Sequence, residues 1–174
     1  LSFGHAAFLG GAAYVTAHAS KAWGLSPELA ILLGMFYACV TGYLFGSLAI
    51  RRQGIYFAMI TLALSQLIFF LALQMKCTGG EDGIQGVPRG HLFRLIDLSS
   101  DTAMYYFVLV LFLVGFLLIQ RTIHSPFGQV LKSIRENEPR AISLGYDVKQ
   151  FKLLAFVISA TLAGMAGSMK SLVF

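Results

Sequence analysis

The side chains of this sequence that could do chemistry are few and widely separated. The four histidines lie at positions 5, 18, 91 and 124 and form no HExxH zinc motif. The sequence contains neither a GxSxG nucleophile elbow nor a GxxxxGK[ST] phosphate loop, and its glycine-rich stretch 78–86 lacks the ligand spacing of a calcium-binding loop. The sequence therefore predicts no catalytic residues, no metal site and no cofactor held by this chain.

Neutral polar side chains inside apolar segments are the remaining candidates. His5, Thr61, Ser65 and Gln66 lie within long uncharged stretches, whereas all 8 acidic residues lie in loops or at helix ends. Proton- and sodium-driven carriers often bury a carboxylate in a span, so the driving force for any transport is expected to come from elsewhere. Ser159, in the last such stretch, is a further neutral polar group. His5, Thr61, Ser65 and Gln66 either bond neighbouring helices or line a pathway for a zwitterionic solute, which dipoles can bind without preventing its release.

Long uncharged segments must position these side chains, and they dominate the sequence. The chain is 57% hydrophobic and 12% charged, whereas soluble domains carry about 25% charged residues. Five segments approach the roughly 17 to 25 residues that cross a bilayer. We therefore predict an all-α polytopic membrane protein. Because the chain opens on Leu1 and closes on Phe174 within apolar sequence, we expect it to be a fragment of a larger permease-sized protein. Its spans are expected near residues 2–22, 28–50, 54–76, 102–121 and 150–171.

The distribution of lysine and arginine predicts the orientation of these spans. Five alternating spans place eight of the 13 basic residues on the side of loop 122–149 and five on the side of loop 77–101. Loops rich in Lys and Arg tend to stay in the cytoplasm, so loop 122–149 is expected to be cytoplasmic and loop 77–101 to lie outside. This orientation explains the net charge of +5 and requires no nucleic-acid partner.

Loop 122–149 begins with a strong local signal for a short helix. The Ser125 hydroxyl can cap free backbone amides, and Pro126 suits a first-turn position whose amide would be unpaired anyway. A helix is therefore predicted over about residues 126–136.

The second half of the loop carries a further set of signals. Pro139 cannot continue the first helix but can open a second one, with a break near Asn137 and Glu138. Gly145 is expected to end that second helix in left-handed backbone. Asp147 then resembles the cap of the last span. The loop is therefore predicted to be structured.

Small residues recur at four-residue steps along two of the predicted spans. They are Gly34, Ala38, Gly42 and Gly46 in the second span, and Ala160, Gly164 and Ser168 in the last. Such stripes let helix backbones approach closely. They indicate either tight packing within one subunit or a subunit interface or mobile pathway wall.

Several motifs together carry a resemblance to a known family. They are Ser2-Phe-Gly-His-Ala-Ala-Phe8, Arg52-Gln-Gly-Ile-Tyr-Phe57, the segment Thr78 to Pro88, Phe127-Gly128, Ile134-Arg-Glu-Asn-Glu138 and Leu144-Gly145. With these motifs the chain resembles the LivM-type permease of branched-chain amino-acid ABC importers, along nearly its whole length. The resemblance implies a multi-pass protein of the bacterial inner membrane that moves leucine, isoleucine or valine.

The same resemblance implies a set of partners. They are a second, different permease subunit, two cytoplasmic ATPase subunits that bind ATP and Mg²⁺, a periplasmic binding protein, and the surrounding lipid. The cytoplasmic loop would be the element that couples the permease to the ATPases. The implied coupling residues are Ile134, Arg135, Glu136, Glu138, Arg140, Ala141 and Gly145. We expect Arg135, Glu136, Glu138 and Arg140 to pair with the ATPase surface, and Ile134, Ala141, Ile142 and Leu144 to pack.

Other readings stay open at this level. The outer loop, with Gly79, Gly80, Glu81 and Asp82, is either a set of tight turns or the docking site of the binding protein. A related permease for urea or another small solute, an ion-driven carrier or channel, and a purely structural subunit are the alternative functions.

Overall fold

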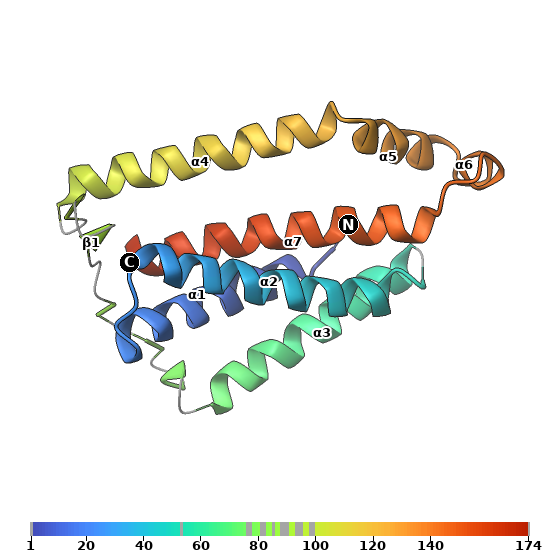
Figure 1. Cartoon of the computed structure of the whole chain (residues 1–174). Helices are drawn as coiled ribbons and strands as arrows, with labels where there is room; N and C mark the ends of the chain where they lie inside the picture. The colour runs from blue at the N-terminus through green and yellow to red at the C-terminus, as the bar shows by residue number, and fades with distance from the viewer. Residues whose placement is uncertain are drawn as a thin grey trace.

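The computed structural model describes residues 2–52, 54–75, 78–80, 83–84, 86–87, 91–92, 96–97 and 100–173 of the 174-residue chain. The elements in chain order are α1 (His5–Ala22), α2 (Pro27–Ala49), α3 (Ile55–Gln74), β1 (His91–Leu92), β2 (Ile96–Asp97), α4 (Asp101–Ile123), α5 (Pro126–Glu136), α6 (Glu138–Ser143) and α7 (Val148–Val173). The two short strands pair antiparallel, and the other described elements are five long helices and the two short helices α5 and α6 (Figure 1). The predicted all-α fold of a polytopic membrane protein is confirmed.

Four of the described helices, α2, α3, α4 and α7, are long and apolar enough to cross a membrane. The predicted first span corresponds to α1, which has 18 residues and contacts both α2 and α7. Because α1 is enclosed by other helices, it can carry small and hydroxyl-bearing residues where a lipid-facing helix would carry larger apolar ones. Its role as a fifth span stays a prediction.

The helices α1, α2 and α7 lie along one another and form the centre of the molecule (Figure 1). Phe8 of α1 is fully buried, with ring centroids of Phe45 and Phe156 at 5.4 and 5.7 Å. One aromatic side chain from each helix thus meets at the same point. In contrast, most large apolar side chains of α3 and α4 are exposed, as expected where a helix faces lipid or further membrane helices.

The stripes of small residues on α2 and α7 meet face to face within the chain. A Cβ added at Gly34 would lie under 3.0 Å from the hydroxyl oxygens of Thr16 and Ser168. A Cβ added at Gly164 would overlap that of Ala38. The stripes therefore bring three helix backbones together inside one subunit, which is the packing role that their spacing indicates.

A buried polar contact joins the same three helices. The Thr16 hydroxyl of α1 lies 3.1 Å from the Ala30 carbonyl oxygen of α2 and 2.9 Å from the Ser168 hydroxyl of α7. Ser168 in turn donates to the Gly164 carbonyl, at 2.9 Å. The hydroxyls of Thr16 and Ser168 are fully buried, and these contacts provide the hydrogen-bond partners that buried hydroxyls need.

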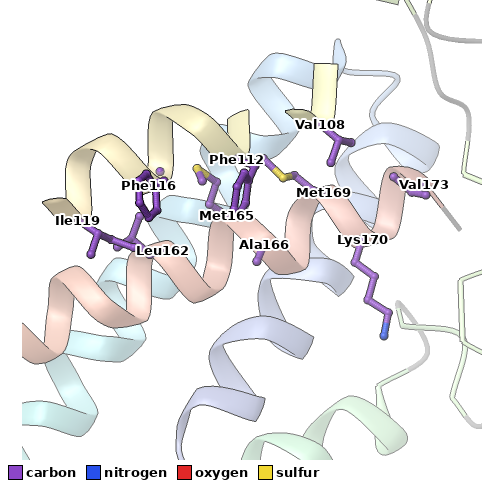
Figure 2. A pocket seen from close by; sticks show the side chains of 11 residues that line it. Val108, Phe112, Phe116, Ile119, Leu162, Met165, Ala166, Met169, Lys170 and Val173 are labelled. Carbon is purple, nitrogen blue, oxygen red and sulfur yellow. The ribbon is translucent and has the colours of Figure 1, made fainter. Parts of the chain in front are cut away.

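Helix α4 packs less tightly against this centre. Near one end, Met104 lies in a buried cluster with Ile31 and Leu172. Farther along, an apolar cavity of about 460 Å³ lies between α4 and α7, where Phe112 and Met165 face each other (Figure 2). The connection from α4 into the short helices α5 and α6 lies at the other end of the molecule (Figure 1).

Candidate coupling loop and adjoining cavity

Loop 122–149 folds into the two short helices that its sequence predicts. The Ser125 hydroxyl accepts the Gly128 N–H at 3.3 Å, and α5 covers Pro126–Glu136. Asn137 then interrupts the helix with an extended backbone, φ −152°, and its side chain accepts the Arg140 N–H at 3.1 Å. The break at Asn137 and the helix that follows it are therefore confirmed, and each helix has its own cap.

The loop rejoins the last long helix through a tight turn. Gly145 has φ +90°, a backbone that residues with a side chain rarely adopt, and its N–H bonds the Ile142 carbonyl at 2.9 Å. Asp147 accepts the N–H groups of Lys149 and Gln150 at 3.1 and 3.3 Å, immediately before α7 begins. The predicted turn at Gly145 and cap at Asp147 are both confirmed.

The loop has a small hydrophobic core, which we call the loop core: Ile134 of α5, Ala141 of α6 and Val148 of α7, all buried. Phe151 of α7 packs against it and stacks on the Phe127 ring, with centroids 5.5 Å apart and planes 19° apart. The loop is thus a folded unit fixed to the start of α7.

This core divides the predicted coupling residues into two groups. Ile134 and Ala141 are 5% and 0% exposed, because they pack inside the loop and not on its surface. Arg135, Glu136 and Arg140 are exposed, as is Gly145. Ile142 and Leu144 are the most exposed large apolar side chains of the loop, at 58% and 65%, and Ile123 and Tyr146 are exposed as well.

Glu138 has a partner within the chain that sequence reasoning did not identify. Its Oε1 lies 2.8 Å from Nζ of Lys152, and each side chain is 30% exposed. The expectation that Glu138 pairs with an ATPase surface did not include this contact. The two residues belong to different helices separated by the Gly145 turn, so no helical spacing connects them, and Lys152 was interpreted as a residue at the membrane boundary.

The Glu138–Lys152 pair lies on the wall of a cavity of about 790 Å³, which we call the loop-side cavity. Its other walls include His5 of α1 and Ser159 of α7, whose Nε2 and Oγ atoms are 2.8 Å apart. Along α7, Lys152 and Ser159 are separated by about 10 Å at 1.5 Å per residue. The loop-side cavity therefore extends from the short helices to a polar pair deep along α7.

The other predicted pathway residues lie elsewhere. Thr61 is fully buried and its hydroxyl donates to the Ala58 carbonyl at 3.0 Å. Ser65 donates to the Leu62 carbonyl at 2.8 Å, and with the exposed Gln66 it lines a second cavity of about 230 Å³ between α1 and α3. The structure thus brings His5 together with Ser159, and it places Ser65 and Gln66 in a different cavity.

The predicted docking residues of the outer loop are described only in part. Gly79 and Gly80 follow α3 with φ of +78° and +61°, which fits the tight turns that their sequence allows. Glu81 and Asp82 lie outside the described residues.

Comparison with known proteins shows what the chain is similar to. The family described as "Branched-chain amino acid transport system / permease component" matches residues 1–174. The high-affinity branched-chain amino acid transport system permease protein LivM of Escherichia coli (strain K12) is 29% identical over 192 residues, which cover 97% of this chain and 45% of that protein. The corresponding LivM protein of Salmonella typhimurium is 31% identical with the same coverage.

A more distant relative extends this similarity to an archaeon. The probable branched-chain amino acid transport permease protein LivM of Methanocaldococcus jannaschii is 25% identical over 182 residues, covering 95% of this chain and 50% of that protein. The chain thus spans about half the length of these curated relatives. No solved structure matches it significantly.

These matches confirm the resemblance that the sequence motifs indicate. The four apolar helices and the similarity to transport permeases fit a multi-pass protein of the bacterial inner membrane. Proteins of this kind are transporters and not, in general, enzymes. Because the match covers every residue, the chain belongs to the family of permease components of branched-chain amino acid transport systems.

Proposed function

We propose that this chain is part of the permease subunit of an ATP-binding-cassette importer that moves leucine, isoleucine or valine into the cytoplasm by alternating access. The observation that carries the proposal is the folded loop 122–149, with two capped helices, its own core and a fixed attachment to α7. A folded element with a fixed attachment can transmit the movement of a partner to the helix that it joins. The names of the relatives support the substrate class.

The ATPase-facing surface of the loop would combine charge with apolar side chains. Arg135, Glu136 and Arg140 supply exposed charges, and Ile142 and Leu144 supply exposed apolar area on α6 and just beyond it. Interfaces gain specificity from such charges and binding energy from buried apolar side chains. Ile134 and Ala141 would act from inside, by holding the two helices in position, and Gly145 by shaping the turn.

The complete importer would contain a second permease subunit, two cytoplasmic ATPase subunits and a periplasmic binding protein. ATP and Mg²⁺ would bind to the ATPases, and this chain would hold no cofactor and contribute no catalytic residue. Loop 122–149 would face the cytoplasm. The outer loop, with Gly79, Gly80, Glu81 and Asp82, would face the binding protein.

The route for the solute would use neutral polar groups. His5 and Ser159 form such a pair on the loop-side cavity, and Ser65 and Gln66 form another in the second cavity. Thr61 is fully buried on α3 and would hold the helix backbones in place. Dipoles of this kind can bind the two charges of an amino acid and still release it.

The proposal is tested in proteoliposomes that contain the full-length permease with its partner subunits. Uptake of labelled leucine is measured with and without ATP and the binding protein. The double variant Arg135→Glu/Arg140→Glu is expected to lose ATP-dependent uptake while its amount in the membrane is unchanged. Lys149→Glu, which reverses an exposed charge at the start of α7, is the matched control and is expected to transport normally.

The results separate the alternatives. ATP-dependent uptake of another small solute would keep the importer mechanism and reject the substrate. Uptake that follows an ion gradient without the ATPases would refute the coupling role of the loop. Normal uptake by the double arginine variant would refute the proposed ATPase-facing surface.

A further inference from the structure

The Glu138–Lys152 ion pair joins the second short helix of the loop to the last long helix. Glu138 is the first residue of α6, and Lys152 is the fifth residue of α7. Between them the chain passes through α6 and the Gly145 turn. The loop core holds the same helices together through apolar side chains. The ion pair is thus a polar tie between α6 and α7 that is separate from the loop core.

The same two side chains line the loop-side cavity. The cavity also takes walls from α1 through His5, from α3 through Phe57, and from α7 through Phe156 and Ser159. An atom pair that connects α6 to α7 is therefore also part of the wall at the loop end of this cavity. A rotation of α6 about the loop core that carries Glu138 away from Lys152 would separate the pair and widen that end while the loop stays fixed to α7.

We propose that the Glu138–Lys152 pair is a gate at the loop end of this cavity, and that Lys152 is a positioning residue through which movement of α6 changes access to it. The proposal rests on the proposed function, because it assigns the coupling between loop and cavity in that importer. It also changes the role expected for Glu138, to which it assigns a contact within the chain.

The environment of the pair suits a contact that opens and closes. Each side chain is 30% exposed, so solvent screens part of the attraction, and separating the two charges costs less than it would for a fully buried pair. A partner can shift such a contact if it binds the displaced loop more tightly than the closed one. Arg52 lines the same cavity as a second cation.

The test uses charge reversal with rescue in the reconstituted full-length importer. Glu138→Lys and Lys152→Glu each place two like charges at the gate, and each is expected to lower ATP-dependent uptake at least about fivefold while ATP hydrolysis continues. The double swap Glu138→Lys/Lys152→Glu restores an ion pair of opposite polarity and is expected to recover at least half of the uptake. Lys152→Arg keeps the charge and is expected to transport as the unmodified protein does.

Two further measurements decide the outcome. The amount of each variant in the membrane shows whether it folds, and Lys149→Glu controls for loss of a positive charge at the same helix end. The number of solute molecules moved per ATP should fall in the single variants and recover in the swap, which loss of folding alone would not produce.

A swap as inactive as Glu138→Lys would overturn the proposal, because it would place the essential partner of Glu138 on another subunit. Uptake unaffected by Lys152→Glu would overturn it as well. The unmodified importer in the same preparation distinguishes these results from a failure of the proposed function. If it shows no ATP-dependent uptake, the importer assignment fails before the gate is tested.

Discussion

Replacing Gly34 by alanine tests the packing that holds the transmembrane centre together. The added Cβ would lie under 3.0 Å from the hydroxyl oxygens of Thr16 and Ser168, and 3.1 Å from the backbone carbonyl oxygen of Ala12. Thr16 and Ser168 are fully buried, so neither can turn toward solvent. To make room, the two hydroxyls must leave their present positions and hydrogen bonds, or the helices α1 and α7 must move away from α2.

The cost can be worked out from these contacts. Overpacking of a dense interior costs about 1–3 kcal/mol. Loss of the hydrogen bond that the single Thr16 hydroxyl proton makes adds roughly 0.6 kcal/mol, the average for membrane helices. Alanine returns about 0.5–1 kcal/mol because it is a better helix former than glycine. We therefore expect Gly34→Ala to lower the free energy of unfolding by about 2 kcal/mol.

The assay compares Gly34→Ala with a glycine that has free space. Gly10 also lies in a helix, α1, but nothing stands within 4 Å of a Cβ added there. Purified full-length variants are heated in detergent, and the fraction that stays monodisperse is measured by size-exclusion chromatography. Gly34→Ala should lose its folded form at a clearly lower temperature than the unmodified protein, whereas Gly10→Ala should match or exceed it. Equal midpoints for the two variants would refute the close packing.

Three further changes test loop 122–149. Ile134→Ala should remove about 2–5 kcal/mol from the loop core, so limited proteolysis should cut the loop faster than in the unmodified protein; equal cutting rates would contradict the core. Asn137→Ala removes the cap of α6 at a cost of about 1 kcal/mol, and amide hydrogen exchange in residues 138–143 should accelerate while that of α7 does not. Gly145→Pro cannot adopt φ +90° and loses the bond to the Ile142 carbonyl. It should abolish ATP-dependent uptake with membrane insertion intact, and undiminished uptake would refute a need for this turn.

The parts of the structure that the sequence predicts are those specified by neighbouring residues. The start of α5 follows from the Ser125 hydroxyl and Pro126, and the break between α5 and α6 follows from Asn137 and Pro139. Each of these signals acts within three or four residues of its own position. The turn at Gly145 is predictable for the same reason, since only glycine accepts its backbone easily.

The features that the sequence does not predict join residues far apart in the chain. His5 and Ser159 are separated by 154 positions, and neither carries a mark that identifies the other. Glu138 and Lys152 each have an ordinary explanation alone, one as a loop charge and one as a charge at a membrane boundary. Only the folding of α6 back along α7 brings them within 2.8 Å.

Helix α7 contacts the loop core, the gate and the central helices α1 and α2, and these contacts limit how the protein can move. Its first turns hold the loop core through Val148 and the gate through Lys152. Its second half meets α1 and α2 so closely that a Cβ at Gly164 would overlap Ala38. Sliding of α7 past its neighbours would force these backbones apart, because dense interiors do not deform continuously. We therefore expect α1, α2 and α7 to move together, and the change of shape to occur at the gate.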